Sequence, residues 1–379
     1  MLPSLKKLPT LWFYIVTLRF LHPTHTIWIL LTFFAIAKIS ATPGGYSLAE
    51  RNLAKVIQEQ FAFFEYAKES HSDQEAELTR KAQSVVSAYE VHLAENPDDV
   101  NGLILFGKFL KKVGQNKQAV DYFLKADLLE PKLAVIKQQI ANYLVESGKA
   151  VDAFPFFLMA AQLSPKVADY HFELGTFIYL FSTELTQEKI LTPQASSTLM
   201  LESFKTATIL SPKKLEYALR YAQCFFDCPN YEKQEALSQW DLILADFSNL
   251  SIAETDYIKL CKARILIELK RKREAKKLIQ SVSSKTLTKS KLSLLKKASD
   301  TKGRVLPLKS SKKSNKEAIK TGFIFPTDKH LQRMQSVSSR LNEEKLLSEL
   351  TLDVLKARLD GAGSVKLEFL SKIPSYPSK

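Results

Sequence analysis

The sequence predicts an all-α protein built as an α-solenoid of antiparallel helix pairs, and three observations lead to this fold class. Only 11 Gly and 15 Pro occur in 379 residues, whereas a fold of many short strands needs more turn residues. Pro97, Pro131 and Pro165 are spaced 34 residues apart, and each closes an apolar helical pattern. A fourth such pattern closes at Pro212. A repeat of this length indicates stacked helical units that share a continuous core.

Residues 1–41 differ from the rest of the chain and predict a signal peptide or a transmembrane anchor. Lys6 and Lys7 precede an apolar stretch over residues 11–37, and small residues follow it up to Ala41. A basic start, an apolar run and a small-residue site are typical of a secretory signal, while the whole stretch is also long enough to span a bilayer. Because the lysines stay on the cytoplasmic side, we expect an exported or membrane-anchored protein whose repeat domain lies on the non-cytoplasmic side.

The two units between the first three of these prolines carry small and aromatic residues at matching offsets. The order in each unit is small, glycine, small, aromatic and small: Gly107, Gly114, Ala119, Phe123 and Ala126 in the first, and Ala141, Gly148, Ala153, Phe157 and Ala160 in the second. A small residue where two helices cross lets their backbones approach closely. The closing proline ends the second helix because it has no amide hydrogen to donate.

This pattern resembles the tetratricopeptide-repeat (TPR) family, whose 34-residue unit is a helix pair that stacks into a superhelix. The resemblance covers about four to five repeats between residues 98 and 281. A third unit is 13 residues longer than the others, with the surplus placed at residues 181–194, and its matching positions are Gly175, Phe204, Ala207 and Pro212. Two later units have drifted, and Lys270 stands in place of a turn glycine. Upstream, residues 45–97 predict a helix pair that caps the array.

The resemblance implies a concave groove lined by the first helix of each repeat. The residues carried over to that surface, called here the predicted groove set, are Asn101, Lys108, Gln138, Asn142, Phe172, Thr176, Tyr179, Gln223, Phe226, Tyr257 and Arg264. Amides suit a peptide backbone and aromatic rings suit a buried side chain, so the set fits an extended segment or a helix. The expected function is a non-catalytic scaffold that binds other proteins or peptides at or beyond a membrane.

A subtype of this family binds C-terminal carboxylates through Lys, Asn and Arg side chains on successive first helices. Lys108 and Asn142 fit that interpretation. Asp169 and Glu173, however, stand in the third unit where basic residues would be needed. A carboxylate clamp therefore remains a minor alternative.

Residues 282–322 predict a flexible basic linker. Within residues 283–320, eleven Lys and Arg304 face only Asp300 and Glu317, a local net charge of +10 out of the chain's +14. Such a segment buries little apolar surface and should stay largely unstructured. It suggests an alternative function, a structural or anchoring envelope protein that grips an anionic surface. Nucleic acid is not an expected partner, because the segment has no aromatic residue on which bases would stack.

Residues 323–379 predict a C-terminal helix and tail. Apolar residues at helical spacing indicate a helix over residues 328–360 with a docking face, against the solenoid or a partner. Gly361, Ala362 and Gly363 would end that helix. Residues 364–372 then form either a short strand or an extended tail.

No catalytic motif is visible, so we expect neither an enzyme nor a cofactor or metal site. Phosphate-loop, dinucleotide, zinc-protease and nucleophile-elbow patterns are missing from the sequence. The six His residues are scattered, and His171 on a first helix is expected to pack rather than react. Chemistry in the 181–194 insertion or the C-terminal region is the remaining alternative. Cys224, Cys228 and Cys261 are expected to be buried thiols, with a disulfide from Cys224 to either of the others left open.

Overall fold

The computed structural model describes residues 47–69, 74–229, 231–299, 327–345 and 353–370. The chain divides into two compact units, Met1–Lys55 and Val56–Lys379. The predicted signal or anchor at residues 1–41 lies outside the described residues. None of the helices in the described ranges combines the length and the apolar character that crossing a membrane requires.

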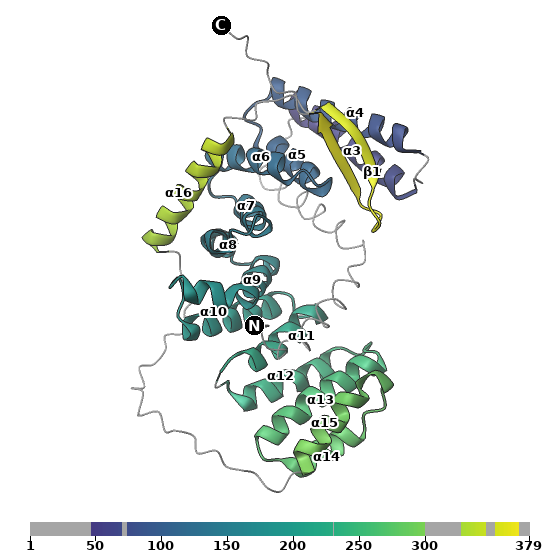
Figure 1. Ribbon diagram of the computed structural model, residues 1–379, viewed down its shortest axis with the longest axis vertical. Coiled ribbons are helices and arrows are strands. Elements are labelled where there is room, and N and C mark those ends of the chain that lie inside the picture. Colours follow the sequence, from purple (N-terminus) through teal and green to yellow (C-terminus); the bar gives the residue numbers. More distant parts are fainter. Residues whose placement is uncertain (1–46, 70–73, 230, 300–326, 346–352, 371–379) are drawn as a thin grey trace, which may run out of the picture. The chain divides into compact units, whose positions relative to one another are not determined.

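Helices in antiparallel pairs make up most of the described chain (Figure 1). The pair expected at residues 45–97 consists of α3 (Leu48–Glu69) and α4 (Glu75–Glu95). From Val56 onward this pair packs on the first helix pair of the repeat array, since the Phe63 ring lies edge-on to the Phe109 ring with 5.9 Å between centroids. The Tyr89 hydroxyl also donates a hydrogen bond to Gln60 at 2.8 Å.

Five further helix pairs fill residues 98–281, which confirms the predicted number of repeats. They are α5 (Val100–Lys112) with α6 (Asn116–Leu129), α7 (Ala134–Glu146) with α8 (Ala150–Leu163), α9 (Ala168–Gln187) with α10 (Pro193–Leu210), α11 (Leu215–Cys224) and the 3-10 turn η2 (Phe225–Asp227) with α12 (Lys233–Asp246), and α13 (Ile252–Glu268) with α14 (Lys272–Gln280). Each helix packs on the one before it and the one after it. The predicted surplus in the third unit lengthens its helices, which have 20 and 18 residues against 13 and 14 in the first.

The small residues of the repeat sit where an aromatic ring from the second helix enters. A Cβ placed on Gly107 would lie 2.6 Å from Cε1 of Phe123, and one on Gly175 would lie 2.9 Å from Cε1 of Phe204. Both rings are buried. Any side chain at these two glycines would therefore force the helices of the pair apart.

Turns between paired helices use a left-handed backbone at a fixed place in the repeat. Gly114 has φ +86° and Gly148 has φ +72°, and Lys270 adopts φ +62° at the matching position of the fifth unit. A residue with a side chain is strained there, because its Cβ approaches the following carbonyl oxygen. The turn geometry has thus been retained in a unit that has lost its glycine.

The basic segment is ordered further than predicted. Its first part forms the 3-10 turn η3 (Lys285–Leu287) and then α15 (Thr288–Ser299), which packs against α13 and α14. The prediction of an unstructured linker over residues 282–322 is therefore wrong for its beginning. Residues 300–322 lie outside the described part of the chain.

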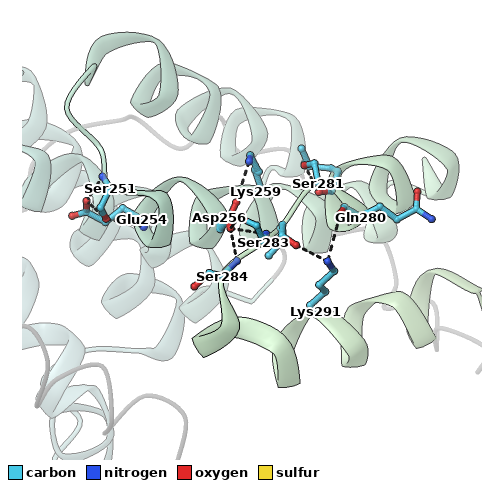
Figure 2. A network of polar contacts seen from close by, with 11 residues as sticks. Ser251, Glu254, Asp256, Lys259, Gln280, Ser281, Ser283, Ser284 and Lys291 are labelled. Atoms are coloured by element: carbon cyan, nitrogen blue, oxygen red, sulfur yellow. Dashed lines mark hydrogen bonds and ion pairs between the residues drawn. The ribbon is translucent and has the colours of Figure 1, made fainter.

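Asp256 contacts the beginning of this ordered segment, and Figure 2 shows these polar contacts. Its Oδ2 accepts the backbone N–H groups of Ser283 and Ser284, both at 2.8 Å. The Lys259 ammonium lies 3.0 Å from Oδ1, and the Lys291 ammonium donates to the Val282 carbonyl at 2.5 Å. Burial would raise the pKa of Asp256, but the Ser284 amide and the other donors outweigh it and hold the pKa at about 2. A buried, ionised carboxylate thus fixes the start of the basic segment to α13.

The C-terminal region is half helix and half β-hairpin. Helix α16 covers Asp328–Lys345, and the strands β1 (Asp353–Leu359) and β2 (Val365–Leu370) pair antiparallel with Ala357 opposite Leu367. The predicted helix over residues 328–360 is therefore wrong in its second half, and the described fold is not purely α-helical. Of the two alternatives left open for residues 364–372, a short strand or an extended tail, the structure has the strand.

Contacts with the first repeats explain why residues 353–359 form a strand. The β1 backbone donates from Ala357 to the Thr79 hydroxyl at 2.8 Å and from Val354 to the Gln83 side chain at 2.5 Å. On β2, the Leu367 N–H donates to the carbonyl of Val113 at 3.0 Å. These partners lie on α4 and in the turn after α5, beside which Figure 1 draws the hairpin in yellow. Tertiary hydrogen bonds here override the helical spacing of the apolar residues.

Helix α16 docks on α6 and α8. Its Arg333 donates to Oδ1 of Asp152 from Nη2 at 2.7 Å and from Nε at 3.0 Å. Arg340 reaches Oδ2 of the same carboxylate at 2.9 Å. The His330 ring stands edge-on to Phe154 with 5.5 Å between centroids. The docking face predicted for this helix is thus used within the chain, against second helices of the array.

Candidate functional site

The predicted groove set is carried by the first helices α5, α7, α9 and α13 and by α11 with its 3-10 extension. Asn101 and Arg264 are exposed, and the other nine residues are half-buried. No member of the set is fully buried, so each keeps part of its side chain at the surface. Successive first helices thus present one series of amide, aromatic and basic side chains.

Several members of the set contact the neighbouring repeat. The Gln223 amide on α11 donates to the Tyr257 hydroxyl on α13 at 3.1 Å. The Arg264 guanidinium on α13 lies over the Phe226 ring, 4.1 Å from its centroid. These contacts join consecutive first helices and hold their side chains in place. At these positions, contacts within the chain already occupy part of the hydrogen-bonding groups and aromatic surface that a ligand would use.

Arg220 joins α11 to α9, and the sequence did not single it out. Its guanidinium carbon lies 3.9 Å from the centroid of the Tyr179 ring and 4.7 Å from that of Phe204. Its Nη1 also pairs with Asp227 at 3.1 Å. Arg220 lies two residues before the small residue Ala222 of its unit, just as Glu173 lies two residues before Gly175 on α9. This shared repeat position was the signal in the sequence that could have identified Arg220.

Asp169, on α9, is satisfied by the residues that precede and begin α11. The Tyr217 hydroxyl donates to Asp169, and the Lys214 ammonium lies 3.1 Å from Asp169 Oδ1 and 2.6 Å from the Tyr217 oxygen. Phe172, a member of the predicted set, stacks on the Tyr217 ring with 4.3 Å between centroids. Phe172 therefore contributes to packing between the third and fourth units.

Glu173, one turn further along α9, is not satisfied in the same way. The residue as a whole is half-buried, yet its Oε2 is buried and has no hydrogen-bond partner. Burial raises the pKa of Glu173 to about 7, while a hydrogen bond from the Gln138 side chain on α7 acts in the opposite direction. The hydroxyl of Thr176, one turn on, is likewise buried and has no partner. Two unpaired buried polar atoms therefore lie one turn apart on the first helix of the third unit.

The structure gives the carboxylate clamp little support. Burial lowers the pKa of Lys108, and Asn142 is half-buried on α7. The next first helix supplies Asp169 and Glu173, so the clamp's remaining basic residues are replaced there by acidic ones. A ligand carboxylate placed across these helices would be repelled.

The other residues considered for chemistry are structural. His171 is buried, and its Nε2 lies 2.9 Å from the carbonyl oxygen of Pro165. Cys224, Cys228 and Cys261 are buried and free of disulfides, as predicted for buried thiols. In the described ranges, no group of three or more His, Cys, Asp or Glu side chains is arranged to hold a metal ion.

The chain is similar to a number of solved structures at low sequence identity. No protein-family model matches the sequence, and no curated protein matches it closely. Among solved structures, the chain is similar to YrrB, described as a TPR protein with an unusual peptide-binding site, with 16% identity and a TM-score of 0.41 over 56% of this chain and 94% of that one. It is also similar to PilF of Pseudomonas aeruginosa, with 16% identity and a TM-score of 0.42 over 64% of this chain and 93% of that one. A third similar structure is the type IV pilus biogenesis factor PilW, with 12% identity and a TM-score of 0.40 over 63% of this chain and 96% of that one. At these values the likeness does not extend to function.

Proposed function

We propose that this protein is a non-catalytic TPR scaffold that binds a segment of another protein across its first helices. One observation carries the proposal: no member of the predicted groove set is fully buried along α5, α7, α9, α11 and α13. A surface repeated along stacked helices is long enough for an extended segment or a helix, and its side chains alternate in chemistry.

The side chains on this surface suit a protein ligand. Asn101 and Asn142 have amides that can both donate to and accept from a peptide backbone. Tyr179 and Phe226 offer aromatic surface to apolar side chains, and both rings are already held by an arginine from the neighbouring repeat. Side chains held in place before binding lose less entropy when a ligand arrives.

The protein is further proposed to act at or beyond a membrane. This part rests on the basic start and apolar stretch within residues 1–41. A topology reporter fused after Pro43 should be active only on the non-cytoplasmic side, and N-terminal sequencing of the mature protein should separate cleavage from anchoring. A reporter active only in the cytoplasm would overturn this location.

A second candidate, an anchoring protein that grips an anionic surface, is favoured by α15. Lys289, Lys296 and Lys297 are exposed on this ordered helix, so their charges are displayed together. Binding of this kind would weaken steeply with added salt.

Co-purification from intact membranes separates the two candidates. The full chain is compared with Asn142→Trp, which places bulk on the first-helix surface, and with a triple variant that changes the three exposed lysines of α15 to Glu. The scaffold proposal expects partners to be lost with Asn142→Trp and kept with the triple variant, both variants showing the wild-type helical signal. The reverse pattern would favour the anchoring candidate.

A further inference from the structure

The third unit contains a built but incomplete polar site on its first helix. Oε2 of Glu173 and the hydroxyl of Thr176 are both buried and have no hydrogen-bond partner. Buried polar groups in proteins are nearly always paired, and a buried carboxylate is paired most strictly of all. Three residues apart on a helix, these two side chains share one face.

The surrounding charges leave Glu173 without a counter-ion. In the part of the chain that the structure describes, no Lys or Arg forms an ion pair with it, whereas its neighbour Asp169 has Lys214 and Tyr217. The groups that act on Glu173 are the Gln138 amide from α7, the Asp169 carboxylate on α9, and the more distant charges of Lys111 on α5 and Lys214 before α11. The site therefore has acceptor capacity and net negative charge when Glu173 is ionised.

We propose that Glu173 and Thr176 receive the guanidinium or ammonium group of an Arg or Lys side chain from the bound protein segment. The inference rests on the proposed function and specifies what its first-helix surface recognises. A guanidinium has several N–H donors in one plane, enough to reach the carboxylate oxygen and the hydroxyl together. Charge-assisted hydrogen bonds of this kind are roughly twice as strong as neutral ones.

Cation binding at this site should depend on pH through the Glu173 carboxyl group. Asp169 already has its partners in Lys214 and Tyr217. The pKa of Glu173 is about 7, so its ionised fraction falls about tenfold between pH 8 and pH 6. An Arg or Lys ligand keeps its charge throughout, so the loss of affinity reports on the protein.

The test uses the full chain and four pools of fluorescently labelled dodecapeptides whose two ends are blocked. Each pool has one residue type fixed at a central position, which is Arg, Lys, Gln or Glu, and a mixture of residues at every other position. Binding is measured by fluorescence anisotropy at pH 6 and pH 8. At pH 8 we expect the affinity of the Arg and Lys pools to be at least about tenfold higher than that of the Gln pool. This preference should shrink at pH 6 and vanish in Glu173→Gln.

The matched control is Glu216→Gln, which removes an exposed carboxylate from the first helix of the next unit and should keep the preference. Equal binding of all four pools would overturn this inference and leave the scaffold proposal standing. A basic preference that persists in Glu173→Gln would also overturn it, because the preference would then arise elsewhere. Failure of every pool to bind the wild-type chain would count against both proposals.

Discussion

Replacing Asp256 with Asn should release the start of the basic segment from α13. The side chain keeps its size, but it loses the charge that holds the Ser283 and Ser284 amides and the Lys259 ammonium. The pKa of Asp256 falls from 3.8 to about 2 on folding. A change of one in pKa corresponds to about 1.4 kcal/mol in the free energy of unfolding. Screening by nearby solvent reduces the total, so we expect a loss of about 1–2 kcal/mol at pH 7.

The sign of the pH dependence follows from the lowered pKa. A carboxylate whose folded pKa is depressed stabilises the protein above the unfolded pKa of 3.8 and loses that contribution as pH falls towards 2. The difference between wild type and Asp256→Asn should therefore be full at pH 7 and about half as large at pH 3.

Hydrogen–deuterium exchange and urea denaturation measure this effect. Amides of residues 283–299 should exchange faster in the variant, while those of α5 to α8 stay protected. Asp241→Asn is the control, since Asp241 is largely exposed and pairs with Lys262 at the surface, and its cost should stay within about 0.5 kcal/mol. Unchanged exchange in α15, or a stability difference that does not shrink at low pH, would refute the role given to Asp256.

Three further substitutions test other parts of the fold. Asp152→Ala removes the acceptor of both α16 arginines, so limited proteolysis should cut near α16 sooner, and an unchanged cleavage rate would show that other contacts hold the helix. Gly107→Ala places a Cβ 2.6 Å from the Phe123 ring, so the free energy of unfolding measured in urea should fall by about 1–3 kcal/mol. In the control Gly361→Ala the new Cβ meets open space, so the free energy of unfolding should change little. Lys270→Gly relieves a residue at φ +62° and should stabilise the chain by about 1 kcal/mol, and a loss of stability would contradict the strain assigned to this turn.

The helix pairs were predictable because the signals that define them are local. Closing prolines, a small residue at the crossing and an aromatic ring one helix later all fall within a single 34-residue unit. Even Lys270 keeps the turn of its unit, with the same left-handed backbone as Gly114. Period and residue type therefore determine each pair almost without reference to the rest of the chain.

The corrected elements depend on contacts between residues far apart in sequence. Residues 353–359 have leucines at helical spacing, but their strand conformation needs the side chains of Thr79 and Gln83. The basic segment has the composition of a linker, but Asp256 orders its start from 27 residues away. Neither partner can be identified from local pattern or composition.

The candidate site shows the same division. Repeat offsets place the predicted groove set on first helices, because the offsets are local. Pairings between units, such as Gln223 with Tyr257, follow from how successive units stack. The sequence showed Glu173 only as an acidic residue in an unsuitable place for a clamp. Its unpaired Oε2 emerges from the packing around it.

Site-specific photocrosslinking in intact membranes tests the scaffold proposal most directly. A photoreactive residue is placed at Asn101 or Asn142 on the first helices, or at the exposed Ile209 or Leu242 on second helices as controls. The proposal predicts that both first-helix positions crosslink to the same partner protein and that neither control does. Crosslinks to a partner only from Ile209 and Leu242 would contradict it.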